Sequence, residues 1–254
     1  MPSHRVKPNY YLLVIEYSGS RYAGWQKQPG MLTIQSELEK AAAVALGKPV
    51  KSIAAGRTDK GVHARGQVVT LSAPANLPSE RLRLALNSLL PKDIAVIGVR
   101  KANAASNARF DATSKVYRYR IWNKTYRSVW QKDCWHIPKW LDLNLMKAAA
   151  HFLVGKHDFR AFEARGGTQC NKICRLKRLT VAGRAGEITL TFVADRFLYK
   201  MVRNMTGTLV DAGLGRIAPG ALIGILEGKN RQRAGMTAPP HGLFLEKILF
   251  GDLL

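Results

Sequence analysis

The order of predicted secondary-structure elements is what most constrains the fold of this chain. Apolar and β-branched residues in short runs predict strands, and apolar residues spaced three or four apart predict helices. On these patterns, each half of the 254 residues predicts strand, helix, strand, strand, helix, strand. This order indicates an α+β fold in which helices pack on a mainly antiparallel sheet.

The first half begins with the strand pattern "YYLLVIEY" and ends with "IAVIGVRK". Its first helix is predicted to start at Thr33 and to end at Gly47, where a helix C-cap belongs. Its second helix is predicted to be capped by Ser79 and stopped by Pro91. The predicted strands are residues 10–17, 52–55, 67–73 and 94–101, and the predicted helices are residues 33–47 and 79–90.

The second half repeats this order after a polar stretch, with the linker expected near residues 102–110. Its strands are predicted at residues 115–123, 175–183, 187–194 and 243–250, and its helices at residues 141–155 and 197–213. A hairpin turn is expected from Arg184 to Gly186. We therefore predict two ferredoxin-like subdomains, residues 1–104 and 105–254, merged into one domain with a central cleft where their sheets join.

Basic residues are in large excess along the chain. Lys and Arg total 40 and Asp and Glu total 17, and the net charge of +23 is more than solubility requires. The cations form short clusters such as "RLKR" and "KNRQR", mixed with aromatic residues. This mixture favours nucleic acid as the ligand, and aromatic side chains on which bases stack are used more in RNA recognition than in duplex DNA recognition. An anionic membrane surface, or a chain that is simply basic, are the alternatives.

Two features predict a cytoplasmic protein. The first apolar run is interrupted by Glu16 and is too short for a signal peptide, and no segment approaches the roughly 20 apolar residues of a membrane helix. The cysteines are odd in number and lack the companion residues of a zinc site, so we expect ordinary buried or half-buried thiols and no metal. They are Cys134, Cys170 and Cys174.

The segment "AAGRTDKGVHARGQ", residues 54–67, is the first candidate for chemistry. Its single carboxylate, Asp59, lies between Arg57 and Lys60, and flanking glycines let the backbone approach a ligand. An Asp among cations stays ionised at neutral pH, which suits a nucleophile or an electrostatic stabiliser. Taken alone, however, the pattern "TDKG" is better explained as a type I turn within a loop.

Aromatic and basic residues alternate in the strand predicted after the linker. The alternation places Tyr117 and Tyr119 on one face and Arg118, Arg120 and Trp122 on the other. A packed aromatic face and a solvated basic face explain Tyr119 and Trp122. For Tyr117, packing and a role at a site both stay open.

Two further positions have a structural and a functional interpretation. Arg203 lies off the apolar stripe of the last predicted helix, either as a surface residue or, if that helix lines the cleft, as a partner of Asp59. Trp25 and Gln26 lie in the glycine-bearing loop "GWQKQ", which either packs or binds.

Several classes of chemistry lack their motifs. No GxxxxGK[ST] loop and no GxGxxG after a strand is present, so nucleotide-dependent chemistry is not indicated. His157 and Asp158 have no nucleophile in a matching motif, and Asp59 has no second carboxylate nearby in sequence.

Ordered motifs over nearly the whole chain resemble the tRNA pseudouridine synthase A family. The most specific is "GRTDKGVHA", and it occurs in order with "GWQKQ", "TIQSELEKA", "LNSLLPKDIAV", "ARFDATSKVYRYRI", "GKHDFRAF", "FLYKMVRNMTG" and "APPHGLFLEKI". Asn107 and Lys200 depart from the family's usual residues, outside the catalytic set.

The resemblance implies isomerisation of uridine to pseudouridine at positions 38 to 40 of tRNA, without metal or cofactor. It assigns Asp59 as the essential carboxylate, Tyr117 to the base and its C5 proton, and Arg203 to an ion pair with Asp59. Arg57 would hold the target nucleotide out of the stack, and Leu243 would form the apolar wall. Further substrate contacts are implied for Lys60, His63, Arg109, Tyr119, Trp25 and Gln26.

The resemblance also implies a homodimer in which one tRNA touches both subunits. From charge and aromatic content alone, a non-catalytic RNA-binding module is the competing class, and a glycosylase that releases the base would use a similar carboxylate. Three chemical roles for Asp59 stay open: attack on the sugar, addition to the base, and removal of a sugar proton.

Overall fold

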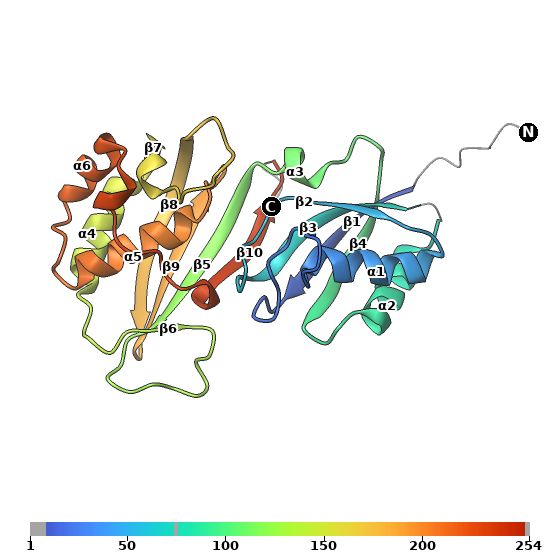
Figure 1. Cartoon of the computed structure of the whole chain (residues 1–254), viewed down its shortest axis with the longest axis horizontal. Coiled ribbons are helices and arrows are strands. Elements are labelled where there is room, and N and C mark those ends of the chain that lie inside the picture. Colours follow the sequence, from blue (N-terminus) through green and yellow to red (C-terminus); the bar gives the residue numbers. More distant parts are fainter. Residues whose placement is uncertain (1–8, 74–75, 252–254) are drawn as a thin grey trace, which may run out of the picture. The chain divides into compact units, whose positions relative to one another are not determined.

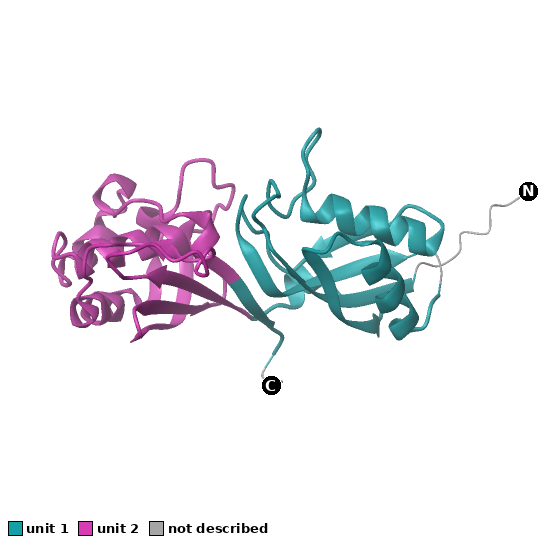
Figure 2. Cartoon of the chain, turned by 90° about the horizontal axis from the view of Figure 1, so that it is seen from below, with its two compact units in different colours: residues 1–113, 245–254 teal, residues 114–244 magenta. Residues whose placement is uncertain are grey.

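A computed structural model of the chain describes residues 9–73 and 76–251 (Figure 1). The chain divides into two compact units, unit 1 with residues 1–113 and 245–254 and unit 2 with residues 114–244 (Figure 2). Each unit packs helices on a mainly antiparallel sheet, which confirms the predicted mixture of helices and antiparallel strands. Residues 1–8, where a leader sequence would begin, lie outside the described residues.

The sheet of unit 1 is built around its first strand. Its described strands are β1 (Asn9–Tyr17), β2 (Lys51–Ala54), β3 (His63–Ala73), β4 (Ile94–Ala102) and β10 (Leu243–Leu249), whose first two residues belong to unit 2. Strand β1 pairs antiparallel with β3 and with β4, and β2 pairs antiparallel with β3. The order β4-β1-β3-β10 leaves β2 also beside β3, so β3 is buried along most of its length.

Two helices supply the rest of this core. Helix α1 (Ile34–Leu46) and helix α2 (Ser79–Leu89) contact each other, α1 contacts β2, and α2 packs on β4. As predicted, α1 starts after Thr33, whose hydroxyl accepts a hydrogen bond from the backbone of Ser36, and ends at Gly47 in the left-handed conformation. The side chains that fill the core from β1 and α1 include Tyr11, Leu13, Ile15, Ile34 and Leu38.

Unit 2 contains a further set of paired strands. Its described strands are β5 (Ser114–Trp122), β6 (Trp135–His136), β7 (Gly155–Asp158), β8 (Ile173–Arg184) and β9 (Glu187–Ala194). The order is β5-β9-β8-β7 with antiparallel neighbours, and the short β6 runs parallel to the end of β5. The predicted hairpin is confirmed: Ala185 and Gly186 link β8 to β9 with positive φ angles, as a two-residue type I′ turn requires.

The helices of unit 2 include one, α5 (Met201–Gly213), that is buried on nearly all sides. The unit also contains α4 (Leu143–Leu153) and α6 (Ala221–Gly228), with short 3-10 turns η1 (Arg160–Phe162), η2 (Arg231–Arg233) and η3 (Pro240–Gly242). Helix α4 packs on β8, on α5 and on α6. Gly207 lets the backbone approach α5 closely, because a Cβ there would overlap the carbonyl group of Met236.

Three predicted boundaries are wrong. Strand β3 begins at His63, so His63 and Arg65 belong to a strand and not to the loop. Helix α5 begins only at Met201, because Lys200 before it has a left-handed φ of 56° that no helix continues through. Ser79 is the first helical residue of α2, and the cap position is taken by Pro78.

The sequence patterns did not predict several short elements, which tertiary contacts stabilise. Helix α3 (Ala108–Asp111) lies in the polar stretch expected to be a linker, and Thr70 of β3 accepts a hydrogen bond from the Ala108 backbone at 2.8 Å. Strands β6 and β7 and helix α6 were also not predicted. All are short, so their sequences carry too few periods to be distinguished from loops.

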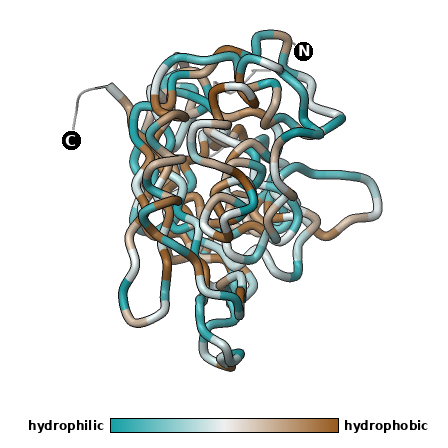
Figure 3. The backbone as a smooth tube through the Cα atoms, turned by 90° about the vertical axis from the view of Figure 1, so that its left-hand side faces the viewer, coloured by the Kyte–Doolittle hydropathy of each residue, from teal (hydrophilic) through white to brown (hydrophobic). Residues whose placement is uncertain are grey.

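Hydrophobic stretches run mainly through the interior, and the outlying turns are largely hydrophilic or mixed (Figure 3). Across the described ranges 9–73 and 76–251, no helix is both long enough and apolar enough to cross a bilayer.

Candidate active site

Asp59 lies at the start of a tight turn in unit 1. The Val62 backbone donates a hydrogen bond to the Asp59 carbonyl at 3.1 Å, which closes a turn over residues 59–62. Gly61 stands third in this turn with a φ of +78°, a conformation that excludes the predicted type I turn and favours glycine. The Asp59 side chain is half-buried between the exposed side chains of Arg57 and Lys60.

Neighbouring segments of unit 1 hold this turn in place through hydrogen bonds to Thr58. The Tyr17 and Thr58 hydroxyls lie 2.8 Å apart in a buried hydrogen bond, and the Trp25 backbone donates to the Thr58 carbonyl at 3.0 Å. Burial raises the pKa of Tyr17 to about 12, so its hydroxyl stays protonated over the physiological range. The residue next to Asp59 is therefore fixed through both its side chain and its carbonyl.

Gly24 brings the "GWQKQ" loop directly against this turn. Its φ is +102°, and a Cβ at this position would lie 2.7 Å from the Thr58 carbonyl oxygen. Trp25 is almost fully buried and its ring packs 6.3 Å from that of Tyr17, centroid to centroid. Gln26 is half-buried. The buried Trp25 thus supports the turn as packing, which is one of the two interpretations its pattern allowed.

The other polar residues around this turn differ in exposure. His63 is buried, and its Nδ1 accepts a hydrogen bond from the Gly19 backbone at 3.3 Å. Arg65 is exposed and pairs with Glu246 of β10 at 3.7 Å. The Gln67 side chain donates to the Gly56 carbonyl at 2.6 Å and ties the start of the loop to β3. His63 is therefore one of the buried side chains that support the turn.

In unit 2, β5 alternates as predicted between a buried and a half-buried face. Tyr117 and Tyr119 are buried, and Arg118, Arg120 and Trp122 are half-buried. The Tyr117 ring meets the Phe197 ring edge-on, with centroids 5.1 Å apart. The Tyr119 hydroxyl donates to the Pro239 carbonyl at 2.8 Å, and burial raises its pKa far above the ordinary value. Tyr119 is thus a fully buried tie between β5 and the segment that leads to β10.

Arg203 points from α5 toward this same segment. Its Nε donates to the Ala238 carbonyl at 2.7 Å, and the Ala238 backbone donates in return to the Arg203 carbonyl at 3.1 Å. Its positive charge acts on Tyr119, whose pKa it lowers against the larger effect of burial. Arg203 is half-buried, and its Nε is bound to the Ala238 carbonyl.

Leu243 begins β10 directly after the 3-10 turn η3. It is buried, and so is the following Phe244. Gly242 just before it packs on Tyr119, since a Cβ there would lie 2.8 Å from the Tyr119 ring. Tyr119 thereby contacts both the residue before this turn and the last residue of the turn, directly before Leu243.

Unit 2 accordingly brings together Tyr119, Arg203 and the segment that ends at Leu243, and unit 1 brings together Asp59, Trp25 and His63. Arg109 lies elsewhere in unit 1, on α3, with its guanidinium 5.6 Å from the centre of the exposed Phe110 ring. The supporting residues that the sequence did not predict are Tyr17, Thr58, Gly24 and Ala238. Only Gly24 carried a signal, as a glycine beside a candidate motif.

Neither of the two departures from the family motifs touches these supports. Asn107 caps α3, with its side chain accepting from the Arg109 backbone at 3.0 Å. Lys200 places its ammonium 4.9 Å from the centre of the Tyr199 ring. In the part of the chain that the structure describes, no three His, Cys, Asp or Glu side chains are grouped so as to hold a metal ion.

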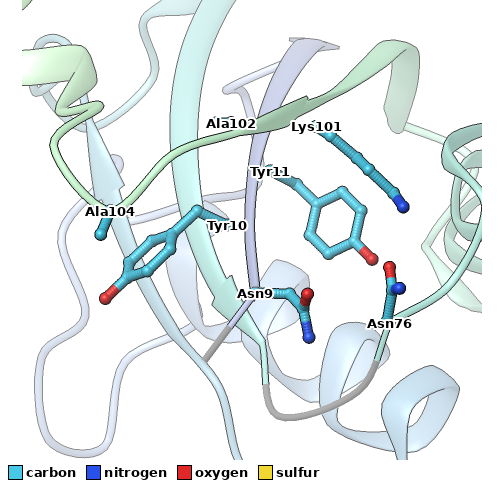
Figure 4. A pocket seen from close by; sticks show the side chains of 7 residues that line it. All are labelled: Asn9, Tyr10, Tyr11, Asn76, Lys101, Ala102 and Ala104. Atoms are coloured by element: carbon cyan, nitrogen blue, oxygen red, sulfur yellow. The ribbon is translucent and has the colours of Figure 1, made fainter. Parts of the chain in front are cut away.

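A pocket of about 280 Å³ lies elsewhere in unit 1 (Figure 4). It lies where β1 begins and β4 ends and is lined by residues that include Tyr10, Tyr11, Asn76 and Lys101, with the Tyr11 ring beside the side chains of Asn76 and Lys101. The Tyr11 hydroxyl already exchanges two hydrogen bonds with the backbone of Leu77, at 2.8 and 2.9 Å. None of the predicted site residues lines this pocket.

Comparison with known families assigns the class of protein. The family model described as tRNA pseudouridine synthase matches residues 13–112 and 148–251, which together make up most of the chain. The chain belongs to the tRNA pseudouridine synthase family. The predicted resemblance is confirmed, and the protein is an isomerase that forms pseudouridine in tRNA.

Individual relatives give a more particular match. The chain is 41% identical to a tRNA pseudouridine synthase A of Thermoanaerobacter sp. (strain X514), over 94% of this chain and 98% of that protein. It is 42% identical to the protein of the same name from Moorella thermoacetica, over 93% and 97%. For the namesake from Bacillus subtilis (strain 168) the identity is 40%, over 94% and 98%. A solved dye-decolorizing protein from V. cholerae matches with 12% identity, over 96% of this chain and 91% of that one, and a TM-score of 0.20, too low to indicate a shared fold.

Proposed function

We propose that the protein converts uridine to pseudouridine at positions 38 to 40, in the anticodon stem and loop of tRNA, with Asp59 as the essential carboxylate. One observation carries the choice of Asp59. It stands on a turn whose neighbour, Thr58, is held by both its hydroxyl and its carbonyl, and it is flanked by exposed cations. The target positions are taken from the sequence resemblance.

The chemistry that Asp59 would assist begins with cleavage of the bond between ribose C1′ and uracil N1. The detached uracil turns, a bond forms between C1′ and C5, the C5 proton leaves, and N1 takes up a proton. Cleavage develops positive character on the ribose, and an ionised carboxylate stabilises that charge. Arg57 and Lys60 favour the ionised form of Asp59 by their charge. Metal and cofactor have no part in this scheme.

The remaining roles extend the same proposal to other side chains. Arg57 is exposed and long enough to fill the space that an extruded base leaves, which offsets part of an extrusion cost of about a few kcal/mol. Tyr117 is proposed to take the C5 proton and Leu243 to form the apolar wall. Arg203 is proposed to keep Asp59 charged, a role that rests on the sequence resemblance. We propose substrate contacts for Lys60, Arg109 and Gln26, and a supporting role for Trp25, Tyr119 and His63 because all three are buried.

We further propose that residues 1–104 and 105–254 form two ferredoxin-like halves of one catalytic domain. The supporting observation is the chain order β1, α1, β2, β3, α2, β4 of unit 1, with β4-β1-β3-β2 as neighbours. The proposal includes a cytoplasmic homodimer in which one tRNA touches both subunits. Light scattering of the purified protein tests the dimer, and a fully active monomer would contradict it.

Unmodified tRNA is the substrate that tests the proposed reaction. After incubation with the protein, pseudouridine is mapped by chemical modification and primer extension. New pseudouridine at positions 38 to 40 is the expected result. Pseudouridine only at other positions would refute the target, and free uracil without pseudouridine would indicate a glycosylase.

A further inference from the structure

Four of the five tryptophans of this chain lie within 19 residues, between the end of β5 and the start of α4. This segment, residues 122–140, is here called the aromatic arm. Its tryptophans are Trp122, Trp130, Trp135 and Trp140, and it also contains Tyr126. In Figure 1 the arm forms the long loop next to the β6 label. The family model matches residues on either side of the arm and none within it.

The arm keeps large aromatic side chains in solvent. The exposed fraction is 90% for Trp130, 76% for Trp140 and 61% for Tyr126. Tryptophan is usually well buried, because removing its large apolar ring from water is more favourable than burying most other side chains. Exposed rings close together in sequence therefore indicate a surface that another molecule covers.

The exposure does not result from a frayed loop, because side chains fasten the arm at its base. The Asn123 amide donates to the carbonyls of Ile137 and Lys139 at 2.8 and 2.7 Å, and its oxygen accepts from the Leu141 backbone at 3.2 Å. The Trp122 indole donates to the Tyr126 carbonyl at 3.0 Å. A loop held in this way loses little conformational entropy when a ligand binds.

The charge of the arm selects the chemistry of that ligand. Its basic residues are Lys124, Arg127, Lys132 and Lys139, against one acidic residue, Asp133. The Asn123 backbone also donates to the Gly186 carbonyl at 2.7 Å, which brings the β8–β9 turn and the exposed Arg184 to the base of the arm. A ligand with anionic groups and flat aromatic faces matches this surface, and unpaired nucleotides of RNA have both. A second copy of a chain with a net charge of +23 would instead add like charges.

We propose that the aromatic arm is a tRNA-binding element, in which Trp130 stacks on an unpaired base and Arg127 and Lys132 contact phosphates. The inference rests on the function described above only in taking tRNA as the RNA. It assigns no chemical step to the arm. Trp130 therefore contributes to affinity and not to the rate of conversion.

The test compares aromatic and aliphatic replacements at one position. Trp130→Phe keeps a stacking ring, whereas Trp130→Leu keeps only an apolar side chain. The Kd for unmodified tRNA is expected to rise at least about fivefold in Trp130→Leu, equivalent to about 1 kcal/mol, and at most about twofold in Trp130→Phe. Leu84→Ala, at an exposed apolar residue of α2 outside the arm, is the matched control and should leave the Kd unchanged.

Salt dependence separates stacking from phosphate contacts. The slope of log K against log salt should be unchanged in Trp130→Leu and smaller by about one to two in the double variant Arg127→Gln with Lys132→Gln. An unchanged Kd in Trp130→Leu, or an unchanged slope in the double variant, would overturn the proposal. If light scattering shows that Trp130→Leu loses a dimer that the wild type forms, while its tRNA Kd is unchanged, the proposal is overturned. The arm would then bind a second copy of this chain.

The rate of pseudouridine formation at saturating tRNA distinguishes a failure of this inference from a failure of the proposed reaction. Trp130→Leu should convert bound tRNA at the wild-type rate. If the wild type binds tRNA through Trp130 but forms no pseudouridine at positions 38 to 40, the proposed target fails and the arm stands. If the wild type forms it there and Trp130→Leu binds as tightly, the arm fails and the target stands.

Discussion

Arg231 donates a hydrogen bond from its Nη2 to the side-chain oxygen of Asn204, 2.9 Å away. The same Asn204 oxygen accepts from the Thr237 hydroxyl at 2.6 Å, and the Asn204 amide donates to the Phe162 carbonyl at 2.7 Å. Asn204 is fully buried and follows Arg203 in α5. The polar cluster therefore fastens the segment that carries Ala238, the hydrogen-bond acceptor of Arg203.

Replacing Arg231 by methionine should lower the free energy of unfolding by about 2–4 kcal/mol. The change removes hydrogen bonds to the carbonyls of Ala234 and Gly235 and to the side chains of Asn204 and Thr237. Urea unfolding measures the loss. Arg233→Met, at an exposed residue of the same 3-10 turn, should change it by less than about 0.5 kcal/mol. Equal effects of the two changes would mean that the buried cluster contributes nothing specific.

Gly24→Ala should impair both stability and pseudouridine formation. The new Cβ would lie 2.7 Å from the Thr58 carbonyl, beside Asp59, at a backbone φ of +102°. Gly30→Ala is the matched control in the same loop, because its φ of +69° is also positive but no atom lies within 4 Å of the new Cβ. We expect about 1 kcal/mol of destabilisation and normal activity for Gly30→Ala, against more than about 2 kcal/mol and reduced kcat for Gly24→Ala. Normal kcat in Gly24→Ala would show that the contact with Thr58 does not support the site.

Asp59→Asn should abolish conversion and leave the tRNA Kd within about tenfold of the wild type. Amide and carboxylate have nearly the same shape, so the turn over residues 59–62 should form in both, whereas only the carboxylate stabilises positive charge on the ribose. Phosphate contacts spread over many cations supply most of the affinity. Single-turnover mapping and a filter-binding titration measure the two quantities. A parallel loss of binding and activity would argue for a structural role of Asp59.

Cysteine reactivity should follow burial. Cys170 is exposed, contrary to the expectation of buried or half-buried thiols, whereas Cys134 and Cys174 are buried and free. Burial raises the pKa of each buried thiol from 9 to about 11. A thiol reagent at pH 8 should therefore modify one cysteine of the native protein rapidly, and Cys170→Ser should remove that reaction. Three fast-reacting thiols in the native state would contradict the structure.

The same raised pKa values determine the sign of a stability change at alkaline pH. Between pH 9 and 11 the unfolded thiols ionise while the buried ones stay neutral, so the unfolded state binds fewer protons and the free energy of unfolding falls as the pH rises. Urea unfolding at pH 8 and pH 10.5 measures this fall. Cys174→Ala should make it smaller, and an identical fall in that variant would exclude a contribution from Cys174.

Periodicity predicted the larger elements of both units because their apolar residues repeat over several turns or pleats. Helix α1 illustrates this, since Thr33 and Gly47 mark its ends through local capping alone. Strand β5 shows the same for alternation, with Tyr117 and Tyr119 on its buried face. Elements without enough periods, such as α3 and β6, were not predictable in this way.

The sequence by itself determined the family, the order of the main elements and the motif that contains Asp59. Only the tertiary structure decided what holds that motif, because the bond between Tyr17 and Thr58 joins residues 41 positions apart. In unit 2, the bond that supports the segment before Leu243 joins Tyr119 and Pro239, which are 120 positions apart. Local patterns record propensity and periodicity over a few residues, so they carry no information about such partners. Trp25 and Tyr119 support the site because they are buried, and burial likewise depends on which segments pack together after folding.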